Sequence, residues 1–204
     1  MVALILDSLA EDQLIRERQA RGADRYDEVW DGVYVMSPIA NNEHQWLASR
    51  LTTVIGNVIE TQGRGRVFAA TNVSDQDTHW VRNYRVPDVA VFLNGNPAED
   101  RDTHWFGGPD FAIEIVSPGD RSREKFEFYA ATGTRELLIL DRAPWSLELY
   151  RLEGETLQLV GASTPGEETI LTSGTIPFTF RLIAGDERPP LEIVHTESGQ
   201  RSII

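Results

Sequence analysis

The amino-acid sequence predicts a mixed α/β fold, in which one β-sheet is flanked by helices, preceded by a helix and a hairpin, and followed by a β-rich extension. Three observations predict this class. Apolar residues recur at helical spacing between positions 42 and 61, apolar runs of strand length begin at positions 66, 85, 111 and 136, and a helix-like segment separates the last two runs. Because helix and strand signals alternate along one chain, the strands are expected to share a sheet that helices cover.

The N-terminal part of the chain predicts a helix, a hairpin and a second helix. Residues 10 to 20 favour a short helix, and residues 26 to 36 favour a hairpin joined at Asp31-Gly32, a dipeptide typical of two-residue turns. Asn41 or Asn42 is the expected N-cap of a helix that ends near Thr61. Its apolar positions are Trp46, Leu47, Leu51, Val54, Ile55, Val58 and Ile59.

The rest of the chain predicts strands separated by one helix. Strands are expected over residues 66–72, 85–93, 111–116 and 136–140, and a hairpin over residues 146–152 and 156–160. Ser117 is the expected cap of the intervening helix, with Pro118 in its first turn, Asp120 in a capping box and Gly133 at its end. We expect one domain over residues 1–204, with a core of about residues 24–152 and a β-rich tail over residues 153–204.

Composition excludes several classes of protein. The chain of 204 residues has no cysteine, so disulfides, thiolate metal sites and cysteine nucleophiles are excluded, and a reducing cytoplasm is the expected location. No apolar run has membrane-spanning length, and the N-terminus lacks the basic region of a signal peptide. The formal net charge is −13, although arginines cluster in the middle of the chain. That cluster is either a local basic face or a set of ordinary solvated arginines.

Glu114 interrupts the apolar run from Phe111 to Val116. Alternation along a strand places it on one face with Ala112 and Val116, and the residues of the opposite face are apolar as well. An unpaired carboxylate in such a strand is either strongly destabilising or becomes neutral, so it needs a cation, a hydrogen-bond network or a metal. The alternative is a glutamate at the end of the strand that reaches solvent or an arginine.

A second carboxylate, Asp88, follows a proline at the start of another apolar strand, 26 residues before Glu114. Two neighbouring strands that each carry one acid can converge on a divalent cation, because Mg²⁺ takes oxygen ligands from one or two carboxylates and from water. A simple proline-aspartate turn is the alternative interpretation of Asp88.

The cationic residues are eighteen arginines and a single lysine, Lys125, which follows Glu114 by eleven positions. A lysine ammonium is a compact donor that can orient a water molecule and stabilise charge on a phosphoryl group, whereas arginine stays forked and charged. The alternative is a solvated lysine on an amphipathic helix, beside Glu124 and Glu127.

The order of these motifs resembles the Uma-two family of restriction-endonuclease-like proteins, within the PD-(D/E)XK nuclease superfamily. The resemblance extends over about residues 10 to 152. The matching segments are Tyr26-Asp27-Glu28-Val29-Trp30-Asp31-Gly32, Met36-Ser37-Pro38, His44, Pro87-Asp88-Val89-Ala90-Val91, Glu114-Ile115-Val116-Ser117-Pro118, Lys125, Tyr129 and Asp141.

The resemblance implies a restriction-endonuclease-like sheet, metal ligands at Asp88 and Glu114, and a catalytic lysine at Lys125. Glu28 resembles the glutamate of the family's hairpin, an additional acid in the site. His44 stands where it could face the site, although a capping or surface histidine is the alternative. In the superfamily pattern the lysine follows the glutamate by two residues, where this chain has Val116, so the lysine would have moved onto the helix.

These observations lead to two hypotheses of different class. The first is a nuclease that uses Mg²⁺ or Mn²⁺ to hydrolyse phosphodiester bonds, with DNA as the expected substrate and a homodimer as the expected assembly for cutting a duplex. The second is a nucleic-acid or protein binding module that keeps the nuclease-like scaffold without turnover, because a fold does not establish a function.

Overall fold

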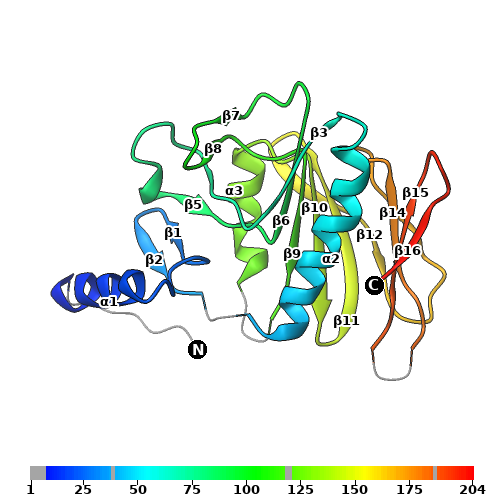
Figure 1. The fold of residues 1–204 in the computed structure, drawn as a ribbon, viewed down its shortest axis with the longest axis horizontal. Coiled ribbons are helices and arrows are strands. Elements are labelled where there is room, and N and C mark those ends of the chain that lie inside the picture. Colours follow the sequence, from blue (N-terminus) through cyan, green and yellow to red (C-terminus); the bar gives the residue numbers. More distant parts are fainter. Residues whose placement is uncertain (1–7, 38–39, 118–120, 186–187) are drawn as a thin grey trace.

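A six-stranded mixed sheet forms the centre of the protein (Figure 1). The computed structural model describes residues 8–37, 40–117, 121–185 and 188–204. The strand order is β12-β11-β10-β9-β6-β3. In chain order, these strands are β3 (Gly65–Ala69), β6 (Val89–Leu93), β9 (Phe111–Ile115), β10 (Glu136–Arg142), β11 (Trp145–Glu153) and β12 (Thr156–Ser163). Strands β9 and β10 pair in parallel, and their connection crosses one face of the sheet.

Helix α2 (Asn42–Ile59) covers one face of this core sheet. The helix begins at the expected cap, since the side chain of Asn41 accepts a hydrogen bond from the backbone N–H of His44 at 2.9 Å. Its apolar stripe, with Leu47, Leu51 and Ile55 fully buried, packs on the odd-numbered side chains of β6 and β9. The expected amphipathic helix is therefore confirmed, and its N-terminus lies beside the start of β6.

The connection between β9 and β10 carries a 3₁₀ helix, Ser122–Lys125, followed by helix α3 (Phe126–Ala131). Helix α3 covers the opposite face of the core sheet, where Phe128 and Tyr129 pack against Ala90 and Ala112. The expected cap formed with Pro118 and Asp120 lies outside the described residues. Among the described residues the α-helix begins at Phe126, after the 3₁₀ helix, and Lys125 is its N-cap.

A second sheet lies beside the face that α3 covers, in the order β2-β1-β5-β4-β8-β7. Its strands are β1 (Glu28–Trp30), β2 (Val33–Val35), β4 (Val73–Ser74), β5 (Tyr84–Arg85), β7 (Glu99–Asp100) and β8 (Trp105–Phe106). A 3₁₀ helix, Trp80–Arg82, precedes β5, and helix α1 (Ser8–Ala20) lies at this end of the protein (Figure 1). The predicted hairpin is confirmed, with Asp31 and Gly32 both at positive φ.

Residues 171–203 of the C-terminal tail form a four-stranded antiparallel sheet at the other end of the protein (Figure 1), whereas β12, at the start of the tail, belongs to the core sheet. The strands of the four-stranded sheet are β13 (Leu171–Thr172), β14 (Phe178–Leu182), β15 (Leu191–His195) and β16 (Arg201–Ile203). The sheet shares an apolar cluster with α2 and the core sheet, in which the rings of Phe111 and Phe180 stack at 5.7 Å. Within the described residues, no helix is long and apolar enough to cross a membrane.

Candidate active site

The strand register places Asp88 beside Glu114. Strands β6 and β9 are antiparallel, with Val89 opposite Ile113, so the residue before β6 lies at the level of Glu114. By strand alternation, Asp88 and Glu114 both belong to the face of the core sheet that α3 covers. Two carboxylates from positions 26 residues apart therefore meet at one edge of the core.

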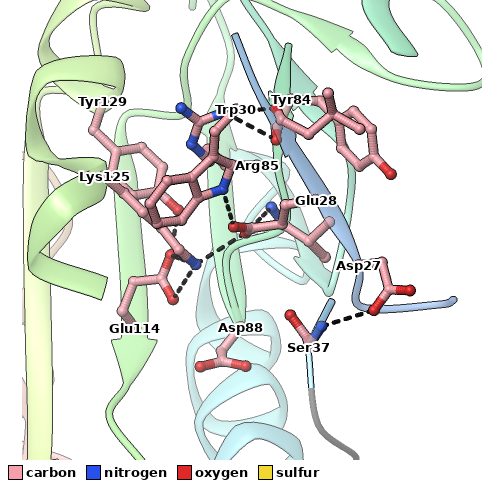
Figure 2. A network of polar contacts seen from close by, with 12 residues as sticks. Asp27, Glu28, Trp30, Ser37, Tyr84, Arg85, Asp88, Glu114, Lys125 and Tyr129 are labelled. Atoms are coloured by element: carbon pink, nitrogen blue, oxygen red, sulfur yellow. Dashed lines mark hydrogen bonds and ion pairs between the residues drawn. The ribbon is translucent and has the colours of Figure 1, made fainter. Parts of the chain in front are cut away.

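Lys125 contacts Glu114 directly (Figure 2). Its ammonium nitrogen Nζ donates to Glu114 Oε1 at 2.9 Å and to Oε2 at 3.1 Å. The hydroxyl of Tyr129, one helical turn later, donates to Glu114 Oε1 as well. Both Glu114 and Lys125 are buried, so the interruption of the apolar strand is matched by a buried cation and a buried hydroxyl.

Glu28 brings a third carboxylate to the same ammonium (Figure 2). Its Oε1 atom lies 2.9 Å from Lys125 Nζ and accepts the backbone N–H of Val86 at 2.7 Å. Its Oε2 atom accepts the indole N–H of Trp30 at 2.7 Å. Because Glu28 and Trp30 alternate onto one face of β1, the hairpin delivers both side chains to the site.

Arg85 attaches this hairpin to the rest of the site. The buried guanidinium lies 4.8 Å from the ring of Trp30 and 4.2 Å from the ring of Phe128 on α3. It also donates to the backbone carbonyl of Val29 at 2.9 Å. Cation–π contacts of this kind are strongest where water is excluded, so Arg85 holds β1 against α3.

Asp88 interacts with a different set of groups. Its Oδ2 atom accepts the backbone N–H of Ile115 at 2.7 Å and lies 3.1 Å from Nε2 of His44. The other ring nitrogen of His44, Nδ1, is buried without a hydrogen-bond partner. The N-terminus of α2 thus brings His44 to Asp88, and the side chain of Asp88 remains 15% exposed at the edge of the cluster.

The site contains more negative than positive charge. Burial, together with the charges of Asp88 and Glu28, raises the pKa of Glu114 to about 8, despite the opposite effect of the charge of Lys125. Burial would lower the pKa of Lys125, but the charges of Glu114 and Glu28 outweigh it and raise that pKa. The pKa of Tyr129 is raised by burial and by Glu114. Lys125 therefore keeps its proton, and Glu114 binds one readily.

The donor chemistry of the site fits a hard divalent cation. Asp88 and Glu114 supply carboxylate oxygens, which Mg²⁺ and Mn²⁺ prefer, and an additional positive charge would offset the excess of acids. Across residues 8–37, 40–117, 121–185 and 188–204, no three His, Asp or Glu side chains are grouped closely enough to hold a metal ion. Two protein carboxylates with water ligands are sufficient for Mg²⁺, so the pair fits this group.

A separate cavity of about 770 Å³ opens on the other face of β1. Asp27, Val29, Tyr34, Trp80 and Tyr84 are among the residues that line it, and none of the five candidate site residues does. Residues 27 and 29 alternate with residues 28 and 30 along the chain. One face of this short strand therefore lines the cavity, and the other faces the candidate active site.

The fold and the clustered acids define a restriction-endonuclease-like protein. A crystal structure from Anabaena variabilis described as a "putative nuclease" superposes with a TM-score of 0.53 at 22% identity, over 65% of this chain and 75% of that chain. The chain itself belongs to the Uma2 (Uma-two) family, whose model, "Putative restriction endonuclease", matches residues 12–182. The family model and the fold agree on this restriction-endonuclease-like class. No curated protein sequence matches it.

Two side chains of the site, Trp30 and Arg85, were not predicted as members of it. Trp30 stands two positions after Glu28, a strand spacing that could have indicated it, whereas Tyr129 belongs to the matching motif and was expected one turn after Lys125 on the same helical face. Arg85 gave no such signal, because its contacts join elements that are distant in the sequence. Sequence spacing therefore identifies site residues that share a strand or helix with a known candidate. It does not identify residues such as Arg85, which reach the site from another element.

Proposed function

We propose that the protein is a divalent-metal-dependent phosphodiester hydrolase that acts on DNA. The contact between Lys125 and Glu114 carries the proposal. The single lysine of the chain lies on a different element from β9, yet it binds the acid that interrupts this central strand. The family assignment supports nuclease chemistry of some kind. Metal dependence, the DNA substrate and the roles of individual residues are our inference.

In this proposal, Asp88 and Glu114 would hold Mg²⁺ or Mn²⁺. Such an ion polarises a phosphate and lowers the pKa of a bound water molecule. The ammonium of Lys125 donates a hydrogen bond to the attacking water and offsets negative charge as it develops on the phosphate. Glu28 keeps that ammonium in place, and His44 orients the carboxylate of Asp88 through the contact at 3.1 Å.

Cleavage assays test this function directly. Supercoiled plasmid and single-stranded DNA should be cut when Mg²⁺ or Mn²⁺ is added, and neither should be cut in EDTA. Glu114→Ala should remove the activity with both ions, whereas Asp100→Asn, which changes an exposed acid on β7, should leave it unchanged. A wild-type protein that cuts neither DNA with any divalent ion would favour the binding module.

Divalent cations should also stabilise the folded protein. An ion that binds only the native state adds about 2.7 kcal/mol at a hundred times its dissociation constant, which corresponds to a melting temperature about 5–10 °C higher for a chain of this size. We expect such a shift in millimolar Mg²⁺ or Mn²⁺ for the wild type and for Asp100→Asn, and its loss in Asp88→Asn. Differential scanning fluorimetry measures the melting temperatures of all three proteins. A wild-type melting temperature that neither ion changes would contradict the metal site.

The assembly remains part of the proposal. One site per chain cuts one strand at a time, so two chains related by symmetry would cut both strands of a duplex in one encounter. Analytical ultracentrifugation with and without duplex DNA would show whether a dimer forms.

A further inference from the structure

Arg121 lies at the rim of the candidate active site, on the segment that leads to Lys125. Its guanidinium carbon is 4.5 Å from the ring of Trp30, the same indole that contacts Arg85. The N–H of that indole is bonded to Glu28, which in turn contacts the ammonium of Lys125. Arg121 is thus connected to the acidic cluster through one aromatic ring and one carboxylate.

The charged partner of Arg121 is Glu124, one turn later. The guanidinium donates through Nε to Glu124 Oε1 at 2.9 Å and through Nη2 to Oε2, which is the two-pronged geometry that arginine also makes with phosphate. Both side chains are open to solvent, with 33% of Arg121 and 55% of Glu124 exposed. Exposed ion pairs of this kind contribute little to stability, so another anion can replace the carboxylate.

The indole gives this arginine a fixed orientation. A guanidinium that rests on an aromatic ring keeps its N–H groups directed away from the ring, so less conformational freedom is lost when an anion binds. The 3₁₀ helix Ser122–Lys125 also joins Arg121 to Lys125 directly. An anion bound at Arg121 would therefore lie on the same short element as the ammonium of the site.

We propose that Arg121, held on Trp30, binds a backbone phosphate of the nucleic acid next to the one that is cleaved, and that Glu124 occupies this position in the free protein. The inference rests on the proposed function, since it assigns a contact within the same substrate complex. It also gives a local reason why a protein of net charge −13 can bind a polyanion at this rim.

The chain contains a matched control for this arrangement. Arg66 is also exposed, lies 4.8 Å from the ring of Phe68, and pairs with an exposed carboxylate, Asp100, at 2.8 Å. It is located on the edge strand β3, opposite Phe92 at the far end of β6 from Asp88. Equivalent substitutions in the two pairs change the net charge equally. Any difference in DNA binding between them therefore reflects where each pair lies on the protein.

Binding of a short fluorescein-labelled DNA, as a duplex and as a single strand, tests the proposal in Ca²⁺ over a series of salt concentrations. Arg121→Gln should weaken binding by about tenfold at low salt, and it should reduce the slope of log Kd against log salt by about one. Glu124→Gln should strengthen binding several-fold, because the competing carboxylate is removed. Arg66→Gln and Asp100→Asn should change neither the affinity nor the slope beyond error.

The outcomes separate this inference from the proposed function. Wild-type protein that binds neither DNA overturns both. Binding that Arg121→Gln and Arg66→Gln alter equally, or not at all, overturns only the role of Arg121, because the surface would then act through its overall charge. Melting temperatures of the four variants should match that of the wild type, which shows that each is folded.

Discussion

Replacing Lys125 with arginine is expected to reduce metal-dependent cleavage of DNA by about a hundred- to a thousandfold, which is the usual effect of removing one positioned electrostatic group. The ammonium fits between Glu28 and Glu114 at 2.9 Å from each, and its side chain is only 10% exposed. A guanidinium keeps the charge but is bulkier and planar, so it cannot present a single compact donor to a water molecule there. Single-turnover cleavage assays in Mn²⁺ would measure the loss.

Stability distinguishes the catalytic role of Lys125 from a purely structural one. Lys125→Arg retains a cation between the two acids and should cost about 1–3 kcal/mol, mainly through overpacking. Lys125→Met leaves the buried carboxylates uncompensated and should cost about 3–5 kcal/mol in urea unfolding. Arg66→Lys, which exchanges the same two residue types on β3, should alter neither the cleavage rate nor the free energy of unfolding. Wild-type cleavage by Lys125→Arg would show that the lysine only neutralises its neighbours.

The strands were predictable because their apolar runs are long enough to reveal a buried sheet. The exception is the expected strand over residues 85–93, which the structure divides between two sheets. Arg85 belongs to β5 of the second sheet, whereas β6 of the core sheet begins at Val89. Pro87 lies between them and has no N–H to donate, so it suits a place where the chain leaves one ladder of hydrogen bonds for another.

The candidate site was predictable in its members but not in its contacts. The local sequence marks Glu114 as an acid in an apolar strand and Lys125 as an unusual cation, yet their separation of 2.9 Å depends on how α3 packs across the sheet. The contact of Asp88 with His44 likewise depends on where α2 begins above β6. Such distances depend on tertiary packing, and the periodicity of a local sequence segment does not predict them.

The C-terminal tail shows a different limit. The strands after β12, from β13 to β16, are two to five residues long, too short for alternation to be distinctive, so only weak strand signals were visible. The structure shows what attaches it to the core. Glu136, the first residue of β10, is fully buried and accepts hydrogen bonds from the segment just after β13. The donors in this segment are the side chains of Ser173 and Thr175 and the backbone N–H groups of Gly174 and Thr175.

Arg151 completes this attachment. It donates to Glu136 Oε1 through Nε at 2.8 Å and through Nη2 at 2.7 Å. A side chain added at Gly174 would come within 3.0 Å of Arg151 Nη2, so the segment after β13 passes close to this ion pair. We therefore propose that the sheet of β13 to β16 and the core sheet unfold as one cooperative unit, with Glu136 as a buried polar contact between them.

Glu136→Gln is expected to destabilise the protein by about 3–5 kcal/mol, because the amide removes a buried charge and turns an NH₂ group toward donors. Urea unfolding followed by far-UV circular dichroism would measure it, with one transition in both proteins. Glu197→Gln is the matched control: it breaks a two-pronged pair with Arg64 in which both side chains are exposed, so it should cost less than about 1 kcal/mol. Equal losses in the two variants would show that Glu136 does not fasten the tail. A separate early transition in the wild type would show that the tail unfolds apart from the core.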